Sequence, residues 1–172
     1  MKEFSSLEVK DLLVNPATLI GNDWMLITAG DSSSFNTMTA SWGGLGHMWN
    51  KPVAFIVVRD HRYTYEFIER CDTFSLSFLG EGYRKALNIC GSKSGRDTDK
   101  VKEAGLTPTF TLNGTPAFRE AKLILECRKL YGQMLVEEGF IAKDIIGKMY
   151  PQKDFHKLYI AEIIGTWAKK EE

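Results

Sequence analysis

Short apolar runs with the pattern of β-strands recur along this 172-residue chain. Val53–Val58 is the longest wholly apolar run, and its six mostly β-branched residues predict a strand covered on both faces. Thr73–Phe78 alternates hydroxyl and apolar side chains, which predicts a strand with one buried face. The same alternation over Lys122–Arg128 and Leu158–Ile164 predicts two long late strands.

An early hairpin and a few short helices complete the expected elements. Trp24–Ala29 and Thr37–Trp42 are expected to pair across the turn-rich Gly30–Ser34. The three expected helices are Tyr65–Cys71 with Thr64 as its N-cap, Gly82–Ile89, and Asp97–Ala104 ending at Gly105. Closely spaced strands with few helices predict a mainly β fold, an antiparallel β-barrel with short peripheral helices. Without repeats or a Pro- or Ser-rich linker, residues 1–172 are expected to form a single domain.

Charge and composition argue against several classes of protein. The 22 Lys and Arg residues balance 22 Asp and Glu residues, so no global field attracts nucleic acid or an anionic membrane. No apolar run approaches the ~20 residues of a membrane span, and Met1–Glu3 leads into no apolar signal core. The chain is therefore expected to be cytoplasmic, with neither nucleic acid nor a membrane as its partner.

The familiar catalytic and metal-binding motifs are missing from the sequence. Cys71, Cys90 and Cys127 are widely spaced, which predicts three reduced, mostly buried thiols. The histidines are also scattered, so no metal site is expected. The chain has no G-x-G-x-x-G and no Walker loop, and Gly91–Gly95 carries Lys where G-x-S-x-G requires Ser. Hydrolases, metalloenzymes and Rossmann dehydrogenases are thereby disfavoured.

One segment is suited to the ring of an anionic aromatic ligand. Asn36–Gly44 combines small residues that admit a planar ring with the hydroxyl groups of Thr39 and Ser41. The alternative is a plain polar hairpin. Trp42 fits either a ligand contact or ordinary apolar packing equally well.

Two further segments are suited to phosphate. Arg59–Thr64 precedes a predicted helix, so Arg62 would add a guanidinium to the N–H groups of a helix start. Gly91–Lys100 repeats this chemistry before another predicted helix. Taken singly, the arginines could be solvated charges and the second segment an exposed loop. Convergence on one ligand would explain both, and it requires that Arg62 and Ser94 face a common groove.

Several strings occur in this chain in a characteristic order. They are Asn36–Gly43, Trp49–Arg59, Arg62–Thr64, Phe74, Gly91, Ser94–Asp97, Asp99–Lys100 and Asp154–His156. Their order and spacing resemble the flavin reductase-like family of FMN-binding split barrels, and within it the flavoredoxin-like branch. The N-terminal segment and Thr107–Thr115 carry little of the likeness. The resemblance implies a split β-barrel and a homodimer with an FMN in each groove at the subunit interface.

The resemblance also implies roles for individual residues. The isoalloxazine and ribityl chain of FMN would lie against Asn36, Met38, Thr39, Ala40, Ser41 and Trp42. The phosphate would be held by Arg62, Tyr63 and Thr64, and the second side would be closed by Ser94, Gly95, Arg96 and Lys100. Backbone N–H groups of Thr39–Trp42, or the Lys100 ammonium, would stabilise the reduced flavin. His61 is expected at the surface or on the phosphate, and His156 is expected to be a structural hydrogen-bonding residue near the dimer contact.

Three functions follow as hypotheses, and none needs a catalytic side chain because the flavin carries the redox step. The leading hypothesis is an NAD(P)H-dependent, flavin reductase-like oxidoreductase that passes hydride or electrons through bound FMN to flavin or another acceptor. The second is a flavoredoxin-type FMN electron carrier reduced by a redox protein donor. The third is an FMN-binding protein without redox activity.

Overall fold

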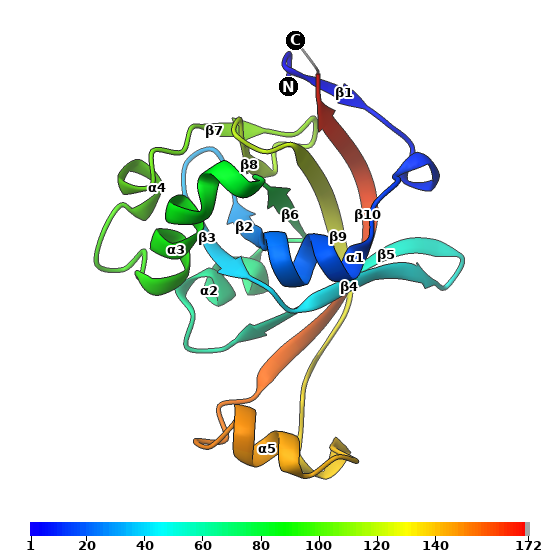
Figure 1. Ribbon diagram of the computed structural model, residues 1–172, viewed down its shortest axis with the longest axis vertical. Coiled ribbons are helices and arrows are strands. Elements are labelled where there is room, and N and C mark those ends of the chain that lie inside the picture. Colours follow the sequence, from blue (N-terminus) through cyan, green and yellow to red (C-terminus); the bar gives the residue numbers. More distant parts are fainter. Residues whose placement is uncertain (171–172) are drawn as a thin grey trace.

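One curled antiparallel sheet forms the body of the molecule (Figure 1). The computed structural model describes residues 1–170. The sheet has the strand order β3-β2-β6-β9-β10-β5-β4, with β1 added to β10. Its strands are β1 (Phe4–Ser6), β2 (Met25–Gly30), β3 (Phe35–Ala40), β4 (Gly43–Met48), β5 (Lys51–Arg59), β6 (Thr73–Phe78), β9 (Leu123–Met134) and β10 (His156–Lys169). The mainly β, antiparallel split barrel expected from the sequence is confirmed.

The barrel is split between β3 and β4, the two ends of the strand order. These strands are neighbours in the chain, joined by Ser41 and Trp42, yet no ladder connects them in the part of the chain that the structure describes. Gly43 starts β4 where a Cβ would lie 2.4 Å from the carbonyl oxygen of Phe55, so only glycine fits there. The sheet therefore curls around its inner core without closing.

Short helices and turns fill the connections. The α-helices are α1 (Pro16–Thr18), α2 (Tyr63–Arg70), α3 (Arg84–Ser92), α4 (Lys100–Glu103) and α5 (Asp144–Met149). Tighter 3₁₀ turns span Val9–Asp11, Glu81–Tyr83 and Glu137–Gly139, and a π-helical turn spans Leu19–Asp23. This agrees with the expected few, short, peripheral helices.

All three expected helix starts differ from the structure: the second helix, α3, begins at Arg84 and not at Gly82. Arg62, not Thr64, is the N-cap of α2; Thr64 is buried in the first turn, where its hydroxyl accepts a hydrogen bond from Asn36 Nδ2 at 2.7 Å. The third helix is only Lys100–Glu103, capped by the Asp99 side chain. Because α3 continues through Ser92, the Gly91–Lys100 segment begins in the last turn of α3, and it ends, as expected, at the start of a helix, α4.

The hydroxyl face of β6 is buried, contrary to the one buried face expected from its alternation. Ser75 and Ser77 are fully buried, and Ser75 Oγ donates to the carbonyl oxygen of Pro116 at 2.6 Å. The cover comes from a second, two-stranded sheet of β7 (Pro108–Phe110) and β8 (Pro116–Phe118), which the sequence pattern did not predict. A second apolar core lies on this side, with Leu87 of α3 and Phe118 of β8 among its members.

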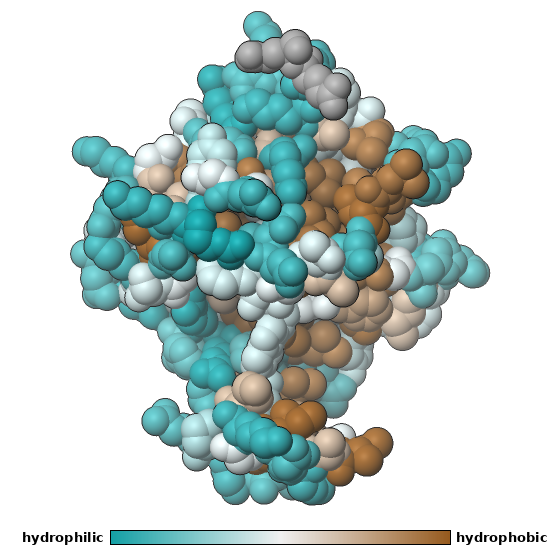
Figure 2. Space-filling view, in the orientation of Figure 1, coloured by the Kyte–Doolittle hydropathy of each residue, from teal (hydrophilic) through white to brown (hydrophobic). Residues whose placement is uncertain are grey.

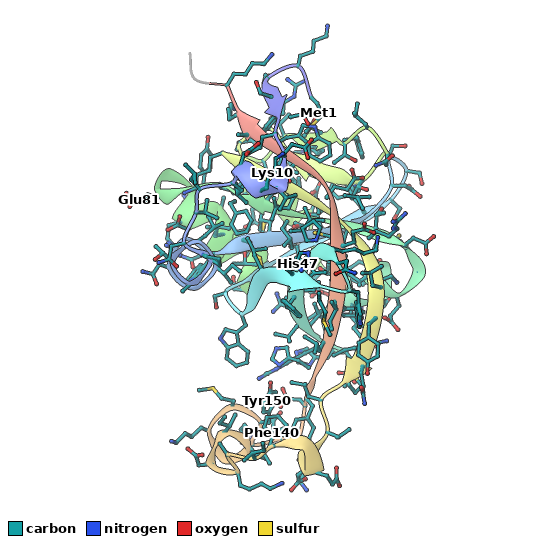
Figure 3. All side chains as sticks on the ribbon, turned by 90° about the vertical axis from the view of Figure 1, so that its right-hand side faces the viewer. Met1, Lys10, His47, Glu81, Phe140 and Tyr150 are labelled. Carbon is teal, nitrogen blue, oxygen red and sulfur yellow. The ribbon has the colours of Figure 1, made fainter. Side chains whose placement is uncertain are left out.

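β9 and β10 continue beyond the barrel as a ribbon that carries a projecting arm (Figure 1). The arm comprises residues 135–155 and includes α5. Phe140, Tyr150 and Phe155 pack together in it, with ring centroids 5.0–5.7 Å apart, and Figure 3 shows Phe140 and Tyr150 at this end of the molecule. The arm therefore has a small aromatic core of its own.

The loop between α3 and α4 is fixed to the barrel at two points. A Cβ on Gly95 would lie 2.1 Å from Asn36 Oδ1, so only glycine allows this approach to β3. Lys100, which is 3% exposed, donates from Nζ to the carbonyl oxygens of Cys90 at 3.3 Å and Lys93 at 3.2 Å. Burial, helped by the charge of Arg62, lowers the pKa of Lys100 to about 8.

The buried charge of Lys100 should make stability depend on pH. Its pKa is about 8 in the fold against an ordinary 10.5, so between these values the unfolded chain binds more protons. Stability relative to Lys100→Met should therefore rise across this window, by on the order of 3 kcal/mol at about 1.4 kcal/mol per pKa unit. Urea denaturation of both proteins below, within and above the window measures the difference. The prediction would be contradicted if the free energy of unfolding had the same pH dependence in wild type and Lys100→Met.

Candidate functional site

A cavity of about 250 Å³ lies where the barrel is split, beside the base of the arm. It is lined by Met38, Thr39, Ala40, Ser41, Trp42, Val57, Arg59, His61, Arg62 and His156. The end of β3 and the segment after β5 thus meet in one place, although they are separate in the sequence. The ladder between β5 and β10 sets His156 directly opposite Arg59.

The positive charge of this cavity is only partly balanced. Arg62 Nη2 and Arg59 Nε are buried, and neither finds a hydrogen-bond partner among residues 1–170. Burial, with Arg59 nearby, lowers the pKa of Arg62, which still leaves a guanidinium charged. The N-terminus of α2 follows Arg62 and adds positive potential. A phosphate group would satisfy these donors, so the residues present fit a phosphorylated ligand.

The arm holds Arg59 in place. Arg59 Nη1 lies 2.6 Å from Asp154 Oδ2, and Nη2 donates to the carbonyl oxygen of Met149 at 2.9 Å. Asp154 is therefore engaged by Arg59, and no Asp or Glu lines the cavity in the described residues. The arm thus orients one cationic wall of the site.

The aromatic wall of the cavity is formed by Trp42 and His156. Trp42 is 42% exposed, and its ring lies 5.2 Å from that of His156 at an angle of 46°. Trp42 is thus a surface residue that lines the cavity and not part of the apolar core, and its contact with a ligand stays a prediction. His156 Nδ1 lies 2.9 Å from the hydroxyl of Tyr150. Burial, and next the charge of Arg59, lowers the pKa of His156 to about 4, so the imidazole is neutral at neutral pH.

The end of β3 presents mainly backbone and small side chains to the cavity. Thr39 Oγ donates to the carbonyl oxygen of Leu87 at 2.5 Å, so this hydroxyl is already used. Met38 is buried beneath the cavity, while Ala40 and Ser41 are only partly covered. Small side chains at these two positions leave room for a flat ring next to Trp42.

Other residues expected at the site lie outside this cavity. Asn36, Gly95, Arg96 and Lys100 line a neighbouring cavity of about 740 Å³, and Tyr63, Thr64 and Ser94 line neither cavity. Ser94 Oγ accepts from the backbone N–H of Arg96 at 3.2 Å. Arg96 pairs with Glu66, donates to the carbonyl oxygen of His61 at 3.2 Å and lies 4.7 Å from the centroid of the Tyr63 ring.

The two basic segments lie on the same side of the barrel, but Arg62 lines the first cavity and Ser94 lines neither, so the expected common groove is not found within one chain. Arg96 reaches the backbone of His61, next to Arg62, so the loop after α3 lies on the same side of the barrel as the start of α2. The ammonium of Lys100 is used by two carbonyl groups, which leaves Arg59 and Arg62 as the arginines of the first cavity.

Arg59, Val57 and His156 were not among the assigned ligand contacts. Val57 and Arg59 are two positions apart on β5, so the period of the strand puts them on one face, a signal that was available. His156 gave no such signal, because only its pairing across β5 brings it to Arg59. No sequence signal pointed to Tyr150 either, because the hydrophobic residues of the arm follow no helix or strand period.

Residues 1–170 contain neither a helix that could cross a membrane nor a metal-binding cluster. None of the helices described there is long and apolar enough to cross a membrane. The same residues contain no cluster of three or more His, Cys, Asp or Glu side chains that could hold a metal ion. All three cysteines are free thiols, and Cys90 and Cys127 are buried as expected.

Solved structures share this fold. An FMN-binding domain of a flavin reductases-like enzyme from Shewanella baltica OS155 is 20% identical, with a TM-score of 0.70 over 96% of this chain and 77% of that one. Flavoredoxin of Desulfovibrio vulgaris (Miyazaki F) is 20% identical, with a TM-score of 0.67 over 96% and 78%. An NADH:FAD oxidoreductase of Streptomyces globisporus C-1027 is 20% identical, with a TM-score of 0.61 over 84% and 73%.

Sequence comparison assigns the family directly. No curated protein matches the chain. The family model described as "Flavin reductase like domain" matches residues 19–172, which include every residue that lines the cavity. The chain therefore belongs to the flavin reductase-like family.

Proposed function

We propose that this protein binds FMN in the cavity at the split of the barrel and acts as an NAD(P)H-dependent oxidoreductase. The observation that carries the proposal is the half-buried guanidinium of Arg62, whose buried Nη2 finds no partner among residues 1–170. An unpaired buried cation is costly, and the phosphate of a bound ligand would remove that cost. Family membership supports a flavin as that ligand.

Each wall of the cavity has a part in the proposed binding. Arg62 and the start of α2 would hold the phosphate, and Arg59 would add positive charge. Trp42 and the small residues Ala40 and Ser41 would lie along the ring, with Met38 beneath them. Lys100 is left out of the proposed contacts, because its ammonium already donates to two carbonyl groups.

The protein's own task in the reaction is position and electrostatics. FMN, when bound, supplies the ability to take up a hydride and pass electrons to an acceptor. The backbone N–H groups of Thr39–Trp42 and the guanidinium groups would favour negative charge on the ligand. Trp42, which is partly exposed, would limit access of water while leaving one side open to a donor. A nicotinamide donor is supported by the structural likeness to an NADH:FAD oxidoreductase.

The proposal includes a homodimer in which each site is completed by the second copy. The cavity of one chain, about 250 Å³, is smaller than the roughly 300–1,000 Å³ of typical ligand pockets. Figure 2 shows hydrophobic surface at the lower end of the molecule, where the arm lies. The exposed apolar side chains of the arm are Val136, Ile141, Ile145 and Met149. A second copy packed against the arm would bury these side chains and enlarge the enclosed site.

Visible absorbance of the purified protein tests cofactor and donor together. The protein is expected to bind FMN and to lose the colour of oxidised flavin when NADH or NADPH is added without oxygen. Stopped-flow absorbance measures the rate with each nucleotide. Bound FMN that neither nucleotide bleaches, but that a ferredoxin-like protein reduces quickly, would replace the proposal with the electron carrier. Bound FMN that no donor reduces would favour a binding protein without redox activity.

Removing the guanidinium of Arg62 tests the proposed phosphate site. Arg62→Ala should weaken FMN binding by about 1.5–3 kcal/mol, the scale of a lost charge-assisted hydrogen bond. Titration calorimetry with FMN measures the change. The matched control is Arg119→Ala, which removes an exposed arginine that does not line the cavity. Equal FMN affinity in wild type and Arg62→Ala would remove Arg62 from the site.

Sedimentation equilibrium tests the dimer. The protein should sediment at twice the mass of one chain, and Ile141→Asp should shift it toward the monomer because a charge would be buried at the interface. Leu112→Asp is the control, since Leu112 is also highly exposed but lies between β7 and β8, away from the arm. A wild-type protein that is monomeric and still binds FMN tightly would show that one chain is enough to form the FMN site.

A further inference from the structure

A buried hydroxyl group of the arm contacts a residue in the wall of the cavity. Tyr150 is 4% exposed and packs between Phe140 and Phe155, and Figure 3 shows it at the end of the ribbon. Within residues 1–170, the hydroxyl of Tyr150 has one hydrogen-bond partner, Nδ1 of His156 at 2.9 Å. His156 in turn lines the cavity. A residue of the arm therefore contacts a wall residue of the site.

The burial of this pair decides which atom carries the hydrogen. If His156 Nδ1 donated to the Tyr150 oxygen, the phenolic hydrogen would be left buried with no acceptor. If the hydroxyl donates to Nδ1, no donor of the pair is left unsatisfied on that side. Burial also raises the pKa of Tyr150, so its hydroxyl keeps the hydrogen. The arrangement with the hydrogen of the imidazole on Nε2 is therefore favoured.

The other ring nitrogen then faces away from Tyr150. Nδ1 and Nε2 lie on different edges of the ring, and the ring itself is 5.2 Å from that of Trp42 at the cavity wall. With Nδ1 occupied by the arm, Nε2–H is the polar edge of His156 left for a ligand. It adds a neutral donor to the guanidinium donors of Arg59 and Arg62.

We propose that Tyr150 is a positioning residue that fixes the hydrogen of His156 on Nε2, so that the imidazole donates a hydrogen bond to an acceptor atom of the ligand in the cavity. The role given to the ligand rests on the proposed function, since the oxygen and nitrogen atoms of a flavin ring are such acceptors. The role of Tyr150 in selecting the tautomer does not depend on FMN.

The same arm also contacts Arg59, the second wall residue that it touches. Met149, the neighbour of Tyr150, accepts a hydrogen bond from Arg59 at 2.9 Å, and Asp154 pairs with the same guanidinium at 2.6 Å. The centre of that guanidinium lies 5.6 Å from the centroid of the Tyr150 ring. The arm thus sets two wall residues of the cavity at once, His156 through Tyr150 and Arg59 through its own contacts.

Nitrogen NMR of the histidine rings tests the proposal. Long-range ¹H–¹⁵N spectra distinguish the two tautomers, and loss of one signal set in His156→Gln assigns His156. The wild type without ligand should show the hydrogen on Nε2, and the Nε2 signal should move when FMN is added. Tyr150→Phe should give a mixture of tautomers and bind FMN about threefold to tenfold more weakly, the range of one neutral hydrogen bond. Circular dichroism confirms that the variant is folded.

Tyr131→Phe is the matched control. It removes the same atom from the same ribbon, where the hydroxyl contacts Gln133 and no histidine, and it should change neither the tautomer nor the FMN affinity. The proposal is overturned if wild-type His156 carries its hydrogen on Nδ1, if Tyr150→Phe keeps the wild-type tautomer, or if bound FMN leaves Nε2 unmoved. A wild type that binds no FMN would refute the proposed function, while the nitrogen signals would still decide the role of Tyr150.

Discussion

The break between β3 and β4 is the constraint on which the rest of this protein depends. Backbone N–H and C=O groups in a continuous sheet satisfy one another across the ladders. At Ser41 and Trp42 the chain passes from one edge of the sheet to the other, and no ladder connects these edges in residues 1–170. Backbone and small side chains are therefore accessible at this point, and the cavity lies along them. A barrel closed by pairing these edges would leave no such opening.

The cavity at this opening carries positive charge. Two guanidinium groups face it, and Asp154, the nearby carboxylate, is held by Arg59. Burying cations with unused donors lowers the stability of the free protein, which a binding site can tolerate because the ligand restores the balance. The arm, an extension of β9 and β10, holds Arg59 and His156 in position. One long ribbon thus builds the barrel and furnishes part of the site.

Predictions from local pattern succeeded where side chains repeat along one element. Val53–Val58 lies within β5, and Thr73–Phe78 is the full extent of β6. β4 was not predicted because Gly43–Met48 has neither alternating apolar residues nor β-branched residues. Its backbone pairing with β5 holds it in the sheet. β7 and β8 are three residues each and begin with proline, so no period can appear. The hydroxyl face of β6 is buried because β7 and β8, which were not predicted, cover it.

The sequence alone determined where most strands lie and which chemical groups the chain offers: an aromatic string, two basic segments and no metal-binding or hydrolytic motif. Both properties are local, because they depend on periodicity and on residue type. Only the tertiary structure decided which groups share a cavity. The register of β5 against β10 brought His156 to Arg59, and packing of the loop after α3 left Lys100 on carbonyl groups, outside the cavity that Arg62 lines. Such contacts depend on strand register and core packing between distant segments, and no local pattern encodes them.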